Sequence, residues 1–119
     1  MQLALPDFSA GAMENWGLVT YREAYLLLDP DNTSLEMKKL VATVITHELA
    51  HQWFGDLVTM KWWDNLWLNE SFANMMEYLA VDGLEPDWHI WEMFQTSEAP
   101  AALTRDATDG VQPIQMEIN

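Results

Sequence analysis

Hydrophobic and polar positions along the chain predict a short extended region followed by helices. Residues 18–28, LVTYREAYLLL, are rich in aromatic and β-branched side chains and alternate partly at their start. This pattern predicts one or two short strands. The next residues, DPDNTS, are types that favour turns and end the extended region.

A long helix is predicted directly after this turn. Thr33 and Glu36, three residues apart, match the capping-box pattern, in which a hydroxyl and a carboxylate satisfy free amides of the first turn. The helix is therefore expected to begin near Ser34 or Leu35.

The same helix is expected to extend to about Phe54, because Gly55 is a typical C-terminal stop. Residues 40–54, LVATVITHELAHQWF, are apolar on nearly every side, which predicts a buried helix. A short extended connection, DLVTMKWW, follows.

Two further helices are predicted in the second half of the chain. Asp64 can cap a helix over residues 65–80, which ends near Gly83. Pro86 suits the first turn of a third helix, over residues 87–99.

Pro100 is expected to kink or end this third helix, and the chain beyond Asp106 looks irregular. The predicted fold class is α+β, mainly helical, with a short N-terminal strand element. A length of 119 residues suits one domain with one core.

Composition limits the chemistry that the chain can carry. Half of the residues are hydrophobic and seven are tryptophan, so some large aromatic side chains are expected to face a ligand or other protein. Because cysteine is absent, any metal must be held by nitrogen and oxygen ligands.

The formal charge of -14 would repel phosphate backbones and favour cationic groups such as a peptide ammonium. No stretch approaches the roughly 20 apolar residues of a membrane helix. The N-terminus, MQLALPDFSAG, lacks a basic region followed by an apolar run. We therefore expect a cytoplasmic protein that binds neither nucleic acid nor membrane.

The stretch VITHELAHQWFGD carries a candidate metal site. His47 and His51 are four residues apart, so on a helix they lie about 40° apart and can direct both imidazoles at one ion. Glu48 is rotated by about 100° from His47, within reach of a water on that ion. The alternative is two helix histidines that are satisfied by hydrogen bonds in the core.

A catalytic zinc site needs a third protein ligand and an open position. Glu70 follows His51 after 18 residues and lies among apolar side chains, where a carboxylate is costly to bury unless it is paired or binds a metal. It is the candidate third ligand; the alternative is a helix residue that faces solvent.

Three polar residues are candidates for contacts to the ligands. Asn74 and Glu77 lie on the helical face of Glu70, and Asp56 follows the first long helix; any of them could hydrogen-bond a ligand imidazole. A surface or capping role is an equal alternative for each. His89 is expected to be a packed or surface histidine.

Two stretches, GAMENWG at residues 11–17 and HELAHQWFGDLVTMKWWDNLWLNESFA at residues 47–73, resemble the zinc aminopeptidases of the aminopeptidase N type. These enzymes are gluzincins, whose signature is H-E-x-x-H followed after 18 residues by E. The resemblance extends over essentially the whole chain.

The resemblance implies a thermolysin-like catalytic domain in which His47, His51 and Glu70 bind one zinc ion. Glu48 would be the general base that takes a proton from metal-activated water and passes it to the leaving amine. The reaction implied is removal of the N-terminal residue from peptides.

In the G-A-M-E-N motif, the resemblance implies that Glu14 binds the free α-ammonium of the substrate. Gly11 and Ala12 are small enough for the substrate backbone to approach, and Met13 is a candidate lining residue of the side-chain pocket. Local sequence alone favours a turn with an exposed acid here.

The chain departs from the family pattern at two points. Ser71 stands where most relatives have glycine. The family also uses a tyrosine several dozen residues beyond the zinc glutamate to stabilise the oxyanion, whereas here only Tyr78 follows Glu70.

Relatives are several times longer, so we expect residues 1–119 to be a partial catalytic domain whose flanking domains are absent. The remaining domains of the full-length enzyme and peptides with a free N-terminus are the expected partners. Alone, the 119 residues are expected to bind zinc, to hydrolyse substrates weakly or not at all, and to be able to self-associate.

Two other functions fit the same residues. One is a non-catalytic, zinc-stabilised module that binds peptide N-termini, and the other is an epoxide-hydrolysing relative. Cobalt or manganese could also occupy a site with these ligands.

Overall fold

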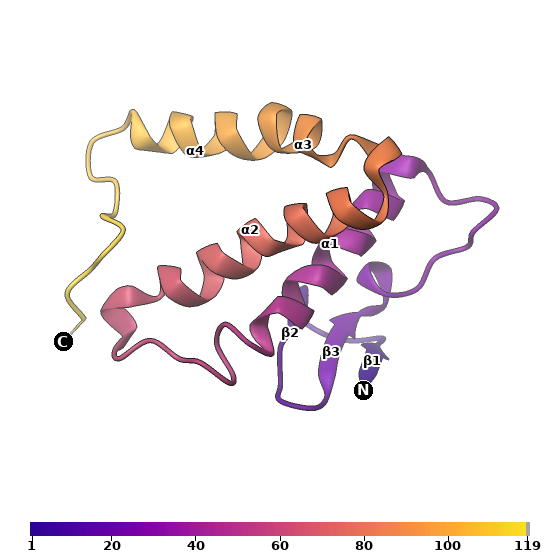
Figure 1. Cartoon of the computed structure of the whole chain (residues 1–119), viewed down its shortest axis with the longest axis horizontal. Helices are drawn as coiled ribbons and strands as arrows, with labels where there is room; N and C mark the ends of the chain where they lie inside the picture. The colour runs from indigo at the N-terminus through magenta and orange to yellow at the C-terminus, as the bar shows by residue number, and fades with distance from the viewer. Residues whose placement is uncertain (119) are drawn as a thin grey trace.

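The computed structural model describes residues 1–118 and contains a small three-stranded sheet beside a group of helices (Figure 1). The strands are β1 (Gln2–Leu5), β2 (Ala12–Met13) and β3 (Val19–Arg22). Their order is β1-β3-β2, with β1 parallel and β2 antiparallel to β3. About half of the residues are helical, which confirms the predicted α+β class.

Only part of the predicted extended region is a strand. β3 alternates between the buried Val19 and Tyr21 and their half-buried neighbours, and a 3₁₀ turn at Glu23–Tyr25 ends it. The residues that follow, 26–28, are irregular, so the region contains one strand of the one or two predicted. Apolar side chains at those positions do not suffice for a strand without a partner to pair with.

The first long helix, α1 (Leu35–His51), begins at Leu35, which confirms the predicted start, but Thr33 is not its cap. Ser34 is the N-cap, and its Oγ accepts a hydrogen bond from the Met37 amide at 3.3 Å. The Thr33 hydroxyl instead accepts from the Asp29 amide at 3.1 Å, inside the preceding turn, so the capping box centred on Thr33 is wrong. α1 also ends three residues earlier than predicted.

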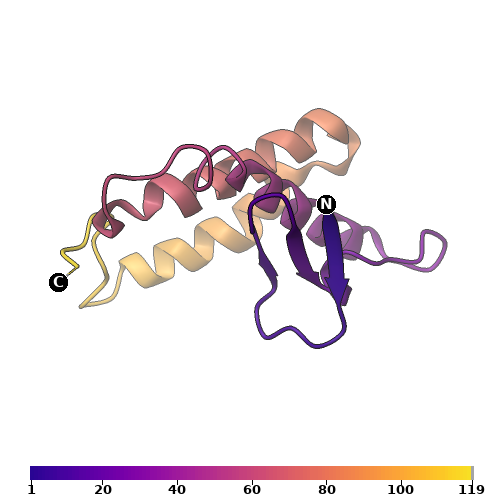
Figure 2. The same ribbon diagram turned by 90° about the horizontal axis from the view of Figure 1, so that it is seen from below.

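The second long helix, α2 (Trp67–Leu84), begins and ends later than predicted and includes Gly83. Asp64 does not cap it. Asp64 lies in a 3₁₀ turn at Trp63–Asn65, where its side chain accepts hydrogen bonds from the amides of Asn65 and Gln115. Figure 1 shows α2 running back along α1, while Figure 2 shows the sheet on one side of this helix pair.

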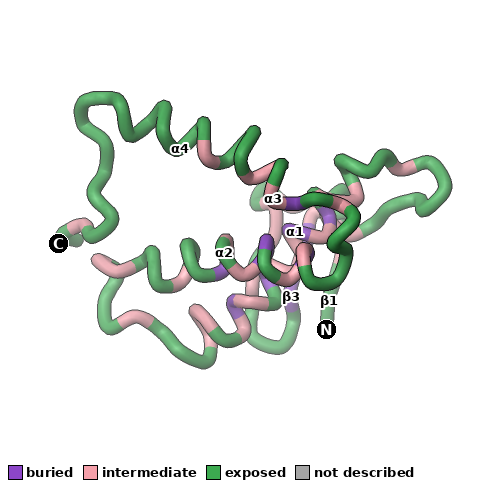
Figure 3. Tube along the Cα trace, turned by 45° about the horizontal axis from the view of Figure 1, so that its top comes forward, coloured by how far each residue is buried: buried purple, intermediate pink, exposed green. Residues whose placement is uncertain are grey.

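The predicted third helix is longer and less regular than expected. A 3₁₀ turn leads into α3 (Ile90–Met93), a π-helical turn over Phe94–Glu98, and α4 (Ala99–Asp106). Pro100 does not end this run, which continues to Asp106, but a π-helical turn interrupts the regular α-helical pattern just before it. Figure 3 shows α4 exposed along most of its length.

The core lies where α1, α2 and α3 meet. Tyr78, Val81 and Ile90 are buried there, and the Tyr78 ring stacks on Trp91 with 5.5 Å between centroids. The opposite face of α1 is open: Leu49 is 39% exposed, so complete burial of residues 40–54 is wrong for this chain.

Exposed aromatic rings are frequent on the described surface. Five of the seven tryptophans have large exposed fractions: Trp16, Trp53, Trp62, Trp63 and Trp67. Within residues 1–118, no helix combines the length and apolar character needed to cross a membrane.

Candidate metal centre

Three side-chain donor atoms converge between α1 and α2. His47 Nε2 lies 3.0 Å from His51 Nε2, and Glu70 Oε2 lies 3.4 Å from the first nitrogen and 3.5 Å from the second. A tetrahedral zinc ion with ligands at about 2.0–2.1 Å holds them about 3.3–3.4 Å apart. The three donors are therefore spaced to bind one ion.

The geometry follows from where each ligand lies on its helix. His47 and His51 occupy the last turns of α1 on one face, and Glu70 occupies the first turn of α2, which folds back along α1. The His51 side chain is 1% exposed, whereas that of Glu70 is 52% exposed. The site is thus closed on the helix side and open toward Glu70, as a catalytic metal site must be.

The outer nitrogen of each imidazole is also bonded. Nδ1 of His47 lies 2.8 Å from Oε2 of Glu77, and Nδ1 of His51 lies 3.0 Å from the carbonyl oxygen of Phe54. Both partners are acceptors, so each Nδ1–H donates and each Nε2 is left with a lone pair for a metal. Of the three residues expected to contact a ligand, Glu77 is brought into this position.

Negative charge surrounds the two imidazoles. Burial lowers the pKa of His47, but hydrogen bonds with Glu70 and Glu77 outweigh it and raise that pKa to about 10. Burial likewise lowers the pKa of His51, while Glu70 and the Phe54 carbonyl raise it to about 9. Both imidazoles in turn hold the pKa of Glu70 well below its usual range. A cluster of this kind stabilises cations, either protons or a divalent metal.

Glu48 lies beside the ligands without joining them. The residue is 7% exposed, and its Oε2 is buried with no hydrogen-bond partner among the described residues. Burial raises the pKa of Glu48 to about 7. Single donor atoms of Glu14, Glu48 and His51 lie within 4.8 Å of one another. A carboxylate with a free buried oxygen and a pKa near neutrality is suited to act as a general base.

A cavity of about 260 Å³ connects the metal ligands to the first strands. It is lined by Gly11, Ala12, Tyr25, Val44, His47, Glu48, Asn74 and Glu77. A side-chain carbon added at Gly11 would lie 3.1 Å from the Tyr25 ring, so this glycine is also needed for packing within the chain. Met13 is 43% exposed and lies outside the lining of this cavity.

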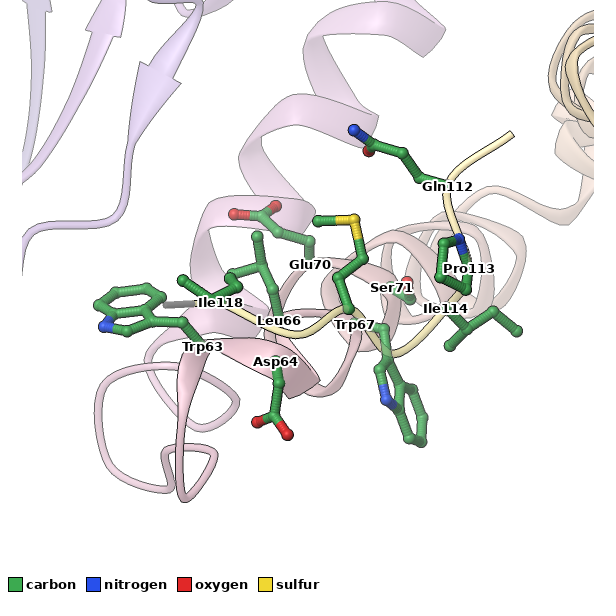
Figure 4. Close-up of a pocket in the computed structure, with 11 residues that line it drawn as sticks. Trp63, Asp64, Leu66, Trp67, Glu70, Ser71, Gln112, Pro113, Ile114 and Ile118 are labelled. Carbon is green, nitrogen blue, oxygen red and sulfur yellow. The ribbon is translucent and has the colours of Figure 1, made fainter. Parts of the chain in front are cut away.

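A larger cavity, of about 490 Å³, lies at the start of α2 (Figure 4). Of the candidate metal ligands it contains only Glu70, and it is otherwise lined by Trp63, Asp64, Leu66, Trp67, Ser71, Gln112, Pro113, Ile114, Met116 and Ile118. Because it contains neither Glu48 nor the histidines, the smaller cavity is the candidate active-site cavity.

The remaining candidates lie near the site in different ways. Asn74 lines the smaller cavity but makes no side-chain hydrogen bond to an imidazole within the described structure. Asp56 accepts a hydrogen bond from Gln52, not from His51. His89 is exposed at the start of α3. Two groups of possible metal ligands occur in residues 1–118, and neither contains His89: His47, His51 and Glu70 form one, and Glu14, Glu48 and His51 the other.

Two residues near the site were missed from sequence. Tyr21 is fully buried in β3 with no partner for its hydroxyl in the described structure, and burial together with the charge of Glu48 raises its pKa to about 12. Gln52 donates to the main chain of Glu14. In the sequence, the only sign of Tyr21 is its place in an alternating strand pattern. The only sign of Gln52 is its place next to His51.

Two histidines of one helix and a glutamate from the next helix form a possible metal-binding group, with a buried carboxylate beside it. Comparison of sequences gives the family. The model of the peptidase family M1 domain matches residues 1–119, and the chain belongs to this family.

The chain is 96% identical over 119 residues to Aminopeptidase N of Lactobacillus helveticus and 89% identical to Aminopeptidase N of Lactobacillus delbrueckii subsp. lactis. In both comparisons all of this chain is covered, together with 14% of the relative. Aminopeptidase N of Canis lupus familiaris is 55% identical over 113 residues, which cover 95% of this chain and 12% of the relative. The chain thus spans about one seventh of the bacterial relatives that it matches.

Proposed function

We propose that this chain forms the catalytic centre of a zinc-dependent aminopeptidase, within a thermolysin-like catalytic domain. The observation that carries the proposal is the convergence of His47, His51 and Glu70 beside a buried carboxylate, Glu48, that binds none of the other groups. Membership of family M1 and the names of the relatives support a peptidase.

The residues present fit a zinc ion. Two imidazole nitrogens and one carboxylate oxygen, with both outer nitrogens already bonded, match the ligand set of catalytic zinc. When bound, zinc would polarise the peptide carbonyl and acidify a water molecule.

Glu48 is proposed to carry the proton transfers. Its unpartnered Oε2 can accept a proton from the attacking water and then deliver it to the amine that leaves. One carboxylate oxygen of Glu48 also lies within 4.8 Å of donor atoms of His51 and Glu14.

Glu14 is proposed to bind the substrate's free ammonium. It follows β2, which is an edge strand, so one side of β2 is free to approach an extended peptide. Gly11 and Ala12 line the small cavity next to Glu48, where their small size lets a substrate backbone approach. A fixed carboxylate at this place would select substrates by their N-terminus.

The proposal is tested by Glu48→Gln in the full-length protein. Hydrolysis of an aminoacyl anilide should fall by at least about 10²-fold, with bound zinc unchanged, because the amide cannot take up the proton. Glu92→Gln, an exposed residue of α3, is the matched control. If Glu48→Gln hydrolyses the anilide at the unchanged rate, Glu48 is not the base. If neither the parent protein nor the variant hydrolyses the anilide and both bind peptide N-termini equally, the chain is a binding module. If an epoxide is hydrolysed while the anilide is not, the substrate class is wrong.

A further inference from the structure

The side-chain amide of Gln52 links the end of α1 to Glu14 and to Asp56. It is the first residue after α1, and its Nε2 lies 3.2 Å from the carbonyl oxygen of Glu14 and 3.1 Å from Oδ2 of Asp56. Within residues 1–118, the bond to Glu14 is the only hydrogen bond between residues 11–17 and α1 or the turn that follows it.

The segment that carries Glu14 has little other support. β2 is two residues long, and its pairing with β3 ends at Met13. Beyond this point Asn15 is held by a side-chain bond to Thr20 at 3.2 Å, which ties the segment to the sheet but not to the metal ligands. The position of Glu14 relative to α1 therefore depends on Gln52.

The position of Gln52 in the chain makes this link short. His51, a metal ligand, is its direct neighbour, so one residue connects the metal site to the main chain of Glu14. Gln52 also bonds to two residues at once, the main chain of Glu14 and the carboxylate of Asp56, whose like charges repel each other. A neutral donor that bonds to both residues opposes their separation.

We propose that Gln52 is a positioning residue that holds Glu14 at the distance from the metal at which a substrate's N-terminal ammonium is bound. The inference rests on the role proposed above for Glu14. It predicts that loss of the Gln52 amide weakens recognition of the ammonium and leaves the metal ligands in place.

The test compares Gln52→Met with Gln115→Met in the zinc-loaded, full-length protein. Gln115 is a matched control because its Nε2 also donates to an aspartate, Asp64, at 3.0 Å, but far along the chain from Glu14. The inhibition constants of leucine hydroxamate and of N-acetyl-leucine hydroxamate are measured for each variant. Gln52→Met should raise the inhibition constant of leucine hydroxamate about tenfold. It should leave the inhibition constant of N-acetyl-leucine hydroxamate and the zinc content unchanged. Gln115→Met should change neither constant.

The kinetic constants give a second readout. In Gln52→Met the KM for an aminoacyl anilide should rise together with the inhibition constant of leucine hydroxamate, while kcat changes less than about threefold. Gln52→Glu keeps the shape of the side chain but replaces the donor by a negative charge. It should therefore raise the KM and the inhibition constant of leucine hydroxamate more than Gln52→Met does. Equal weakening of both hydroxamates, loss of zinc, or unchanged constants in both Gln52 variants would overturn the proposal.

Glu14→Gln separates this inference from the function on which it rests. If Glu14→Gln abolishes the preference for the free amine and Gln52→Met does not weaken it, the positioning role of Gln52 is wrong and that of Glu14 stands. If Glu14→Gln leaves the preference unchanged, the ammonium role of Glu14 is wrong, and the positioning role is overturned with it.

Discussion

Oε2 of Glu77 lies 2.8 Å from Nδ1 of His47, although 30 positions separate the two residues in sequence. The contact exists because α2 carries both Glu70 and Glu77, two turns apart on one face, and packs this face against α1. One helix thereby supplies a candidate metal ligand, Glu70, and the acceptor that fixes the tautomer of another candidate ligand, His47.

Replacement of Glu77 by glutamine should weaken metal binding. The amide can still contact Nδ1 of His47 but no longer offers a full negative charge, so affinity for zinc should fall by about 10–100-fold. Competition with a chromogenic chelator measures this change. Glu92→Gln, on the exposed surface of α3, should have no effect. Equal affinities in the two variants would show that Glu77 is not needed for the metal site.

Metal binding should release protons at neutral pH. The pKa values of about 10 for His47 and about 9 for His51 mean that the metal-free pair holds a proton at pH 7. The Nε2 atoms are 3.0 Å apart, a distance that suits one hydrogen between them. Zinc needs both nitrogens unprotonated, so at least one proton must leave.

Calorimetry of zinc binding in buffers with different ionisation enthalpies counts these protons. Apparent affinity should rise as the pH increases from 7 toward 9, because proton competition declines. A binding enthalpy that is independent of the buffer would contradict a protonated metal-free pair.

The elements of the fold that depend on local sequence could be predicted, but their ends could not. Turn and cap residues, the glycine stops and the apolar stretch between them were enough to predict α1 and α2. The choice between Thr33 and Ser34 as the cap of α1 depended on which hydroxyl the preceding turn uses. β1 was missed because a four-residue edge strand has too little alternation to detect, and its pairing with β3 is a tertiary contact.

The candidate ligands were predictable because the spacing of two histidines on one helix is a local property. The groups around them were not. Glu77, Asn74 and Asp56 were equivalent in sequence, and only the packing of α2 against α1 brings Glu77 to His47. Gln52 carries no local signal, since its partner, Glu14, is 38 positions away.

Gly55 should be intolerant of any side chain. Its φ of +138° is one that other residues rarely adopt, and an added side-chain carbon would overlap Oδ1 of Asn69. Gly55→Ala should therefore lower the free energy of unfolding by at least about 1–3 kcal/mol. It should also weaken zinc binding, because displacement of Asn69 would shift the next residue, Glu70, the candidate third ligand.

Gly83→Ala provides the comparison for this prediction. Gly83 lies in α2 with open space around its α-carbon, so alanine should stabilise the protein by about 0.5–1 kcal/mol. Urea unfolding and chelator competition of both variants check the two effects. Similar results for the two alanines would contradict the close approach of Asn69 to Gly55.

Glu48 should lower the stability of the metal-free protein at alkaline pH. Burial raises its pKa from 4.5 to about 7 in the folded state, so the folded protein binds this proton more tightly than the unfolded chain does. The resulting stability is fully present below pH 4.5 and is lost as the pH rises through about 7. Glu48→Gln removes the ionisation and should increase the free energy of unfolding by about 1–3 kcal/mol at pH 8, with little gain at pH 4.5.

Urea unfolding at both pH values, after removal of metal, measures this difference. Glu92→Gln should show no such dependence, because its carboxylate is exposed in either state. A gain in Glu48→Gln that is the same at both pH values would mean that the substitution acts through packing and not through charge. Stabilisation confined to alkaline pH would instead show that the protein maintains a buried, ionisable base at a cost to its own stability, as expected when a residue is kept for catalysis.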